Sequence, residues 1–193
     1  LGGGTHHAFA DAGEGYCVFN DAVVAARVLQ RSNLAARILI VDCDAHQGNG
    51  TAAMTTGDSS VFSFSIHGER SFPTEKVPSD LDIALPIGVG DLEYLVRLED
   101  GLAEAMARAA PDVVIYLAGA DPHVEDRIGR MALTLGGLRR RDELVLSTCS
   151  LAGLPIAVTL AGGYGRKVQS TVAVHVQTVR LAAGFADGRA NRA

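Results

Sequence analysis

The chain has 193 residues, of which 48% are hydrophobic and 20% are charged, and its formal net charge is -5. A chain of this length buries enough surface to form a core without disulfides. Its composition is that of a globular domain and excludes a fibrous or disordered protein. With 17 basic and 22 acidic residues it has no basic surplus, so we expect no direct contact with nucleic acid.

Cysteine usage and one uncharged stretch bear on the compartment. The three cysteines lie far apart and form no C-x-x-C pair, which favours a reducing, cytoplasmic environment over a disulfide framework. Residues 144–165 carry no charge over a length that could span a membrane. Gly153 and Pro155 interrupt this stretch, so we interpret it as a helix end, a turn and a strand, and expect no membrane partner.

The predicted elements alternate between helix and strand. Helices are expected over 21–30, 91–110, 137–153 and 166–183, and strands over 37–42, 61–66, 81–86, 112–119 and 155–163. The strand at 81–86 is expected at an edge, and the other strands are apolar runs typical of strands buried on both faces. Residues 46–50 are expected to be a loop. The pattern predicts one domain over 1–185 and a polar tail over 186–193.

Alternating strands and helices predict an α/β fold with three α-β-α layers and a mostly parallel sheet. Such sheets bind ligands beyond the carboxyl ends of their strands. Metal-ligand and acid/base residue types follow four of the predicted strands here: Asp44, His46, His67, Asp121, His123 and Tyr164. We therefore expect a functional site at this edge.

The densest of these clusters surrounds Asp44. Asp42, Asp44 and His46 alternate along the chain, so in an extended segment their side chains share one side. Asp121 could complete an Asp-His-Asp set, and three protein ligands with an open position are typical of catalytic zinc. Alternatively, Asp44 caps a helix and His46 is an ordinary loop residue.

Other loop residues could act beside a metal. His6 and His7 follow three glycines and could transfer protons near neutral pH, or be a solvated pair or the remnant of a tag. Tyr164 follows two glycines and could donate a hydrogen bond to an oxyanion, or pack on the next helix. Tyr16 and Phe72 could line an apolar channel, or anchor their loops over the core.

Five motifs occur along the chain in a distinctive order: GGGTHHAFADAGEGYCVFNDA, VDCDAHQGNG, SIHGERSFP, YLAGADPHVEDRIG and LAGGYG. In this order they resemble the zinc-dependent histone deacetylase family, which has the arginase/deacetylase fold. DAHQGNG and AGGYG are most similar to its class IV branch and the bacterial relatives of that branch. Relatives have a further segment before GGGTHH, so the resemblance implies a domain that lacks its N-terminal part.

The resemblance implies a role for each matching residue. The Zn²⁺ ligands, one ion per chain, would be Asp44, His46 and Asp121; the catalytic residues would be His6, His7 and Tyr164; and the acyl-lysine channel would include Gly15, Tyr16 and Phe72, with Ile128 at its rim. Asp42 would lie behind His6, and Asn49 behind His7. Asp42 and Ser65, with backbone carbonyls of residues 44 and 46, would hold a structural K⁺.

Two positions depart from the pattern of many relatives. Asn49 stands where relatives outside class IV have an aspartate, so the pKa of His7 should be lower here, because an amide stabilises an imidazolium less well than a carboxylate does. Ile128 stands where polyamine-selective relatives have a glutamate, which argues against a polyamine substrate. Glu125 lies close enough to leave that alternative open.

The sequence thus predicts a zinc-dependent amidohydrolase acting on N-acetyl-lysine or longer N-acyl-lysine, in a protein, a peptide or a small acylated amine. The alternatives are a catalytically inactive fragment or binding module of the same fold, and a deacetylase of acetylated polyamines. A two-metal ureohydrolase would need further carboxylates, but Gly48 stands two residues after His46 and His123 stands two residues after Asp121. A nucleotide-binding domain is disfavoured because no G-x-G-x-x-G follows the first strand. Fifteen arginines against two lysines indicate a bacterial source.

Overall fold

A single parallel sheet organises the protein in its computed structural model, in which residues 3–190 are described. The strands are β1 (Ile38–Asp42), β2 (Val61–Gly68), β3 (Leu81–Leu85), β4 (Val113–Ala118) and β5 (Ile156–Leu160). They are arranged in the order β3-β2-β1-β4-β5, and every neighbouring pair is parallel. The predicted edge position of residues 81–86 is confirmed.

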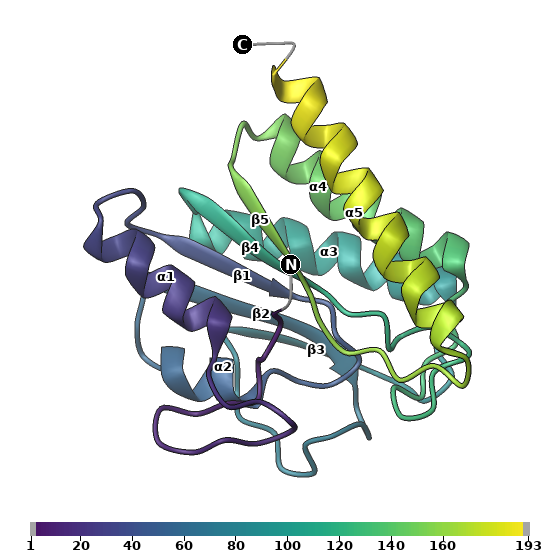
Figure 1. Cartoon of the computed structure of the whole chain (residues 1–193). Helices are drawn as coiled ribbons and strands as arrows, with labels where there is room; N and C mark the ends of the chain where they lie inside the picture. Colours follow the sequence, from purple (N-terminus) through teal and green to yellow (C-terminus); the bar gives the residue numbers. More distant parts are fainter. Residues whose placement is uncertain (1–2, 191–193) are drawn as a thin grey trace.

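Helices cover both faces of the sheet (Figure 1). They are α1 (Asp21–Arg31), α2 (Asn49–Thr55), α3 (Asp91–Ala109), α4 (Leu135–Leu151) and α5 (Val168–Ala190). Alternate residues of β1 point to opposite layers: Ile38 and Ile40 join the apolar cluster under α1, whereas Leu39 and Val41 join the larger cluster under α3 and α4. The three-layer α-β-α architecture predicted from the sequence is confirmed.

Local signals explain why α1 begins and ends where predicted. The side chain of Asn20 accepts a hydrogen bond from the backbone N–H of Val23 at 3.1 Å, which satisfies one of the free donors at the helix start. At the other end Ser32 caps the helix, and Asn33 takes a left-handed φ of 54°, a conformation that asparagine tolerates better than most residues.

Three expectations differ from the structure. Residues 46–50 were expected to be a loop, but α2 begins at Asn49, and its small side chains give no apolar periodicity that could signal a helix. β5 is half-buried rather than buried on both faces, because it lies at the edge of the described sheet. The polar tail expected over 186–193 is helical through Ala190, since α5 continues through an alanine-rich stretch; residues 191–193 lie outside the described residues.

The uncharged stretch over 144–165 folds as the end of α4, a turn and β5. Gly153 forms that turn with a φ of +71°. Within residues 3–190, no helix is long and apolar enough to cross a membrane.

A buried arginine ties the ends of two strands together. Arg141 on α4 is fully buried, and its Nη1 donates to the carbonyls of Gly119 at 2.6 Å and Cys43 at 3.3 Å. Its charge is matched by Asp142, whose Oδ1 lies 2.9 Å from the Arg141 Nε. Asp142 in turn accepts hydrogen bonds from the hydroxyls of Tyr116 and Thr178, each at 2.6 Å. This network fixes the spacing between the loops that follow β1 and β4.

We expect Tyr116→Phe to lower the free energy of unfolding by about 1–3 kcal/mol, because it leaves the buried carboxylate of Asp142 one donor short. Tyr94→Phe is the matched control: Tyr94 is equally buried, but its hydroxyl lies beside the weakly polar thiol of Cys43 and makes no hydrogen bond to a carboxylate of the described residues. Its cost should stay below about 1 kcal/mol. Urea unfolding of the two variants measures the difference, and equal losses would contradict the proposed importance of the network.

Candidate active site

Three buried side chains converge at the carboxyl edge of the sheet. Asp44 and His46 lie in the loop after β1, and Asp121 lies in the loop after β4. His46 Nδ1 is 2.9 Å from Asp44 Oδ1 and 2.9 Å from Asp121 Oδ2. Over the described part of the chain these residues form the one group of three whose ligand atoms could hold a metal ion, all within 4.8 Å of one another. The Asp-His-Asp set expected from the sequence is therefore brought together.

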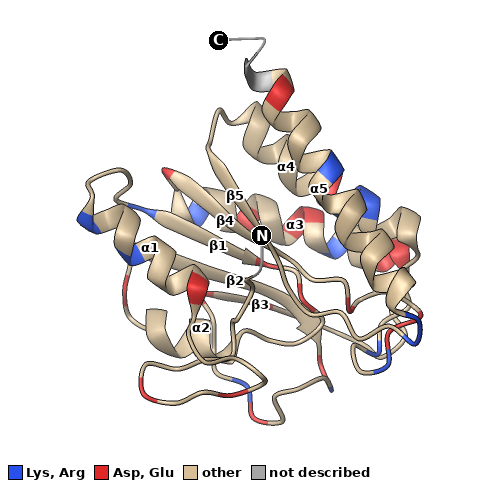
Figure 2. Ribbon diagram, in the orientation of Figure 1, with Lys and Arg blue, Asp and Glu red and all other residues tan. Residues whose placement is uncertain are grey.

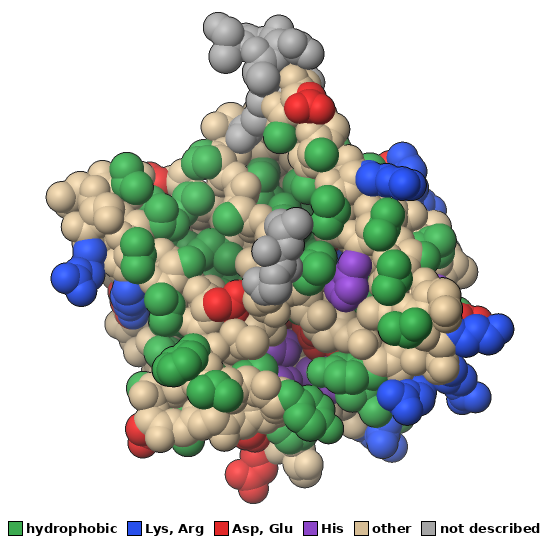
Figure 3. All heavy atoms as spheres, in the orientation of Figure 1, with side chains coloured by type: hydrophobic (Ala, Val, Ile, Leu, Met, Phe, Trp, Pro, Cys, Tyr) green, Lys and Arg blue, Asp and Glu red, His purple; other side chains and the backbone are tan. Residues whose placement is uncertain are grey.

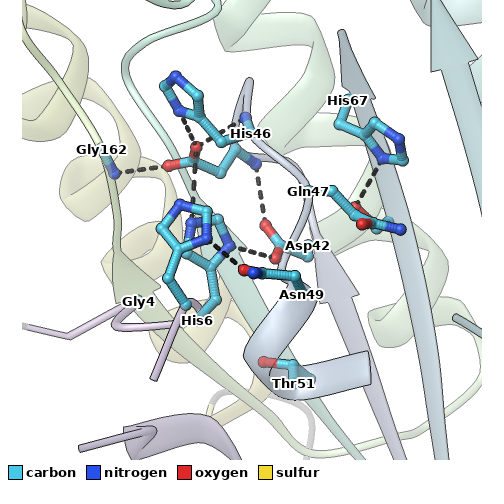
Figure 4. Close-up of polar contacts among 12 residues, drawn as sticks. Gly4, His6, Asp42, His46, Gln47, Asn49, Thr51, His67 and Gly162 are labelled. Atoms are coloured by element: carbon cyan, nitrogen blue, oxygen red, sulfur yellow. Dashed lines mark hydrogen bonds and ion pairs between the residues drawn. The ribbon is translucent and has the colours of Figure 1, made fainter. Parts of the chain in front are cut away.

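Backbone amides orient both carboxylates of this group. The N–H of Gly162 donates to Asp44 Oδ2 at 2.7 Å (Figure 4). The N–H of Ala45 donates to Asp121 Oδ1 at 2.8 Å. Asp121 thus has one oxygen held by the backbone and the other facing the imidazole. Both oxygens of Asp44 accept from the backbone, because the N–H of His46 donates to Oδ1 at 2.9 Å, and Oδ1 also faces the imidazole. This preorganisation is what a metal site requires, because ligands that already point inward need not be reordered on binding.

The charge of the group calls for a cation. Burial and the nearby charge of Asp44 raise the pKa of Asp121 to about 7. Burial lowers the pKa of His46, but its hydrogen bonds to Asp121 and Asp44 outweigh burial and raise that pKa to about 10. Two carboxylates buried side by side are costly unless a proton or a metal ion compensates them. Two oxygen ligands and one nitrogen ligand suit a divalent transition metal, and His46 opens onto a pocket where further ligands can bind.

Glycine is required at position 162. A Cβ there would lie 2.2 Å from Asp121 Oδ2 and 2.6 Å from Asp44 Oδ2, in the space between the ligand atoms. Gly162 therefore lets the backbone approach the candidate metal centre closely.

His6 pairs with a carboxylate beneath this centre. Its Nδ1 lies 2.6 Å from Asp42 Oδ2, as Figure 4 shows, and Asp42 Oδ1 accepts from the N–H of Asp44 at 3.1 Å. Burial lowers the pKa of His6, but the charges of Asp42 and Asp44 together outweigh it and raise that pKa to about 9. His6 is therefore a cation at neutral pH.

His7 has the opposite character. Its Nδ1 lies 2.7 Å from Asn49 Oδ1, and its ring centroid is 4.1 Å from that of His6. Burial and the positive charge of His6 lower the pKa of His7 to about 4. The sequence predicted a pKa lower than an aspartate at position 49 would give. The bond to Asn49 does raise the pKa of His7, but burial and the charge of His6 outweigh that rise. A neutral imidazole beside a cationic one is available to accept a proton.

Tyr164 follows β5 and faces the same centre. Its N–H donates to Asp126 Oδ2 at 2.6 Å, and its ring centroid lies 6.4 Å from that of His46. Burial and the charges of Asp44 and Asp121 raise the pKa of its hydroxyl. The hydroxyl therefore stays protonated at neutral pH and can donate a hydrogen bond.

A pocket of about 860 Å³ opens above the centre. His7, His46 and Tyr164 line it, as do all four residues expected to bind substrate: Gly15, Tyr16, Phe72 and Ile128. Figure 3 shows histidine side chains at the bottom of a hollow, with hydrophobic side chains beside them. Tyr16 is 90% exposed, so it projects at the mouth and does not anchor its loop over the core.

Some features of the site lie outside what the sequence indicated. Ser65 is buried on β2, directly opposite Asp42 in the sheet register, and its Oγ lies 3.0 Å from His67 Nδ1. This places the two residues expected at a K⁺ site side by side, and the ion itself stays a prediction. The contact between Asn49 and Glu14 was not foreseen, because the two residues are 35 positions apart and share no motif.

We expect Asp42→Asn to lower the pKa of His6 from about 9 toward its ordinary value of about 6.5, because the amide removes one of the two charges that together outweigh burial. A raised pKa in the folded state contributes stability that is fully present below about pH 6.5 and is lost as the pH rises through about 9. NMR titration of metal-free protein follows His6, and urea unfolding across this window follows stability. An unchanged His6 pKa in the variant would rule out this account.

Comparison with known proteins places this geometry in a family. Residues 1–179 match the histone deacetylase domain. An uncharacterised protein of Picosynechococcus sp. is 49% identical over 90% of this chain and 58% of its own length, and histone deacetylase 2 of Arabidopsis thaliana is 28% identical over 93% and 47%. The crystal structure of an acetylpolyamine aminohydrolase from Burkholderia pseudomallei superposes with a TM-score of 0.78 at 27% identity, covering 93% of this chain and 53% of that one. The chain spans about half the length of these relatives, and it belongs to the histone deacetylase family.

Proposed function

We propose that this protein is a zinc-dependent deacylase that hydrolyses the amide of N-acetyl-lysine or longer N-acyl-lysine. The observation that carries the proposal is the convergence of a three-ligand centre, a neutral histidine and a protonated tyrosine at the base of one pocket. Each of the three groups matches one need of amide hydrolysis: polarisation of the carbonyl, a proton acceptor for water, and a donor to the oxyanion.

Asp44, His46 and Asp121 are the residues that would hold the zinc ion. When bound, zinc supplies a Lewis acid that polarises the substrate carbonyl and lowers the pKa of a water molecule. A structural K⁺ beside Asp42 and Ser65 is part of the same proposal, supported by their adjacent positions in the sheet.

His7 is the proposed general base and acid. As a neutral imidazole it takes a proton from the attacking water and later delivers that proton to the leaving amine. His6, held cationic by Asp42, does not exchange that proton and stabilises the negative charge that develops nearby. The hydroxyl of Tyr164 donates to the oxygen that becomes the oxyanion.

The pocket favours a lysine side chain in a peptide over a free polyamine. Tyr16 and Phe72 supply apolar walls that fit a methylene stem. The charged residues lining the pocket are three arginines and two glutamates: Arg70, Arg127, Arg130, Glu14 and Glu69. Figure 2 shows lysine and arginine segments gathered in the loops below α5. Excess positive charge at the mouth repels a polycation.

The alternatives have less support. The similarity to an acetylpolyamine aminohydrolase makes an acetylated polyamine the alternative substrate. Glu125, the acidic residue that left this alternative open, is hydrogen-bonded to Ser170 and lies outside the pocket lining. A ureohydrolase needs two metal ions, and the described residues supply one group of three ligands. The wide spacing of the three cysteines along the sequence, with no C-x-x-C pair, supports a reducing, cytoplasmic compartment, and the arginine-rich composition supports a bacterial source.

Zinc-loaded protein should hydrolyse lysine peptides somewhere in a series from acetyl to longer acyl groups. Tyr164→Phe should lower kcat by about 100-fold, because it removes the oxyanion donor, while zinc content stays at one ion per chain. Initial rates and metal analysis of both proteins test this. Undiminished turnover in the variant would exclude the oxyanion role, and no turnover by the wild type at any acyl length would favour the non-catalytic binding module.

An acetyl-lysine peptide should also give a kcat/KM about tenfold higher than N-acetylputrescine, since the mouth repels the second amine of the polyamine. Arg70→Gln should lower this ratio of kcat/KM values because it removes a positive charge from the pocket lining. Raised salt should lower the ratio as well, because it screens the repulsion. Arg97→Gln on α3 removes an exposed charge outside the pocket lining and should leave the ratio unchanged. A ratio that favours the polyamine would overturn the substrate assignment.

A further inference from the structure

A hydrogen-bonded chain leads from His7 away from the metal centre to a glutamate. His7 Nδ1 lies 2.7 Å from Asn49 Oδ1, and Asn49 Nδ2 donates to Glu14 Oε2 at 3.1 Å. His7 and Asn49 are buried, and Glu14 is half-buried in the wall of the pocket. Glu14 does not bond His7 directly, so any influence it has passes through the amide.

The donor and acceptor roles of these groups determine where the protons lie in the hydrogen-bonded series from Glu14 through Asn49 to His7. An ionised carboxylate only accepts hydrogen bonds, so the amide must turn its NH₂ group toward Glu14. Its carbonyl oxygen must then face His7, and because that oxygen only accepts, the Nδ1 of a neutral His7 must carry the proton. The other ring nitrogen, Nε2, is left with a free lone pair. Without Glu14, the amide could rotate by half a turn and donate to Nδ1, which would move the ring proton to Nε2.

We propose that Glu14 is a positioning residue that selects the tautomer of His7 through Asn49. The catalytic consequence rests on the proposed function, in which His7 must accept a proton at Nε2. An aspartate at position 49 would select the same tautomer directly, but it would place a full negative charge against the ring. Here the charge stands one residue further out, where Glu14 is partly solvated.

The loop that carries Glu14 is packed rigidly against His7. The backbone N–H of Glu14 donates to the carbonyl of Cys17 at 3.1 Å, and the N–H of Cys17 donates back to the carbonyl of Glu14 at 2.7 Å. Gly15 has a φ of +53°, and a Cβ there would lie 2.3 Å from His7 Cδ2. The backbone next to Glu14 thus lies against the imidazole, so the Glu14 side chain starts beside the ring and reaches Asn49 within hydrogen-bond distance.

The tautomer can be read without catalysis. In metal-free protein with ¹⁵N-labelled histidine at neutral pH, we expect Nδ1 of His7 to resonate as a protonated nitrogen and Nε2 as an unprotonated one, with the signals assigned by comparison with His7→Ala. Glu14→Ala should mix or reverse this pattern. The double variant Glu14→Ala with Asn49→Asp should restore it, because the new carboxylate can only accept from Nδ1.

Kinetics of zinc-loaded protein then test the consequence. We expect Glu14→Ala to lower kcat about tenfold with little change in KM, and the double variant to recover most of the loss. Asp11→Ala is the control: it removes an exposed carboxylate from the same loop, outside the pocket lining, and should change neither parameter.

The two readouts separate the possible failures. An unchanged ¹⁵N pattern in Glu14→Ala overturns the inference, as does a double variant that restores neither the pattern nor kcat. A rise in KM alone would assign Glu14 to substrate binding and would also overturn it. If no form of the protein hydrolyses acyl-lysine, the proposed function fails, while the tautomer measurement still decides the role of Glu14.

Discussion

Ionisable side chains buried together at one edge of the sheet impose the main constraint on this structure. Asp42, Asp44, Asp121 and three histidines lie there out of water. Burying such a group destabilises the fold unless a partner compensates its charge or occupies its hydrogen-bonding atoms. The two adjacent histidines therefore differ in charge. His6 becomes a cation because it faces carboxylates, and His7 stays neutral because it is buried beside that cation.

Hydrogen bonds from the rest of the fold hold this arrangement in place. Arg141 is buried on the side of the sheet away from α1 and joins the backbone of the β1 and β4 loops, which carry the candidate metal ligands. Backbone N–H groups from the loop after β5 and from the loop after β1 donate hydrogen bonds to the carboxylates of Asp44 and Asp121. The ligand set is thus held by hydrogen bonds from main-chain groups, which have fewer ways to relax than side chains have. Such rigidity is what a preorganised catalytic centre demands.

Much of the fold followed from the sequence, because parallel strands buried on both faces leave an unmistakable apolar run. Residues 38–42 and 113–118 are the clearest cases. The convergence of Asp44, His46 and Asp121 also followed, since the carboxyl ends of parallel strands meet at one edge. The short helix α2 could not be foreseen, because its buried residues are small or polar and have no periodicity. The same is true of the Glu14–Asn49 contact, which depends on how the loop that carries Glu14 packs against the first residue of α2.

Gly162 shows a different kind of vulnerability. It contributes no side chain, only a backbone N–H and the close approach that a missing Cβ allows. A single methyl group at this position would overlap oxygens of both carboxylates, so the centre can be lost through an addition and not only through a deletion. An inventory of chemically active side chains therefore understates the number of positions at which this site is intolerant of mutation.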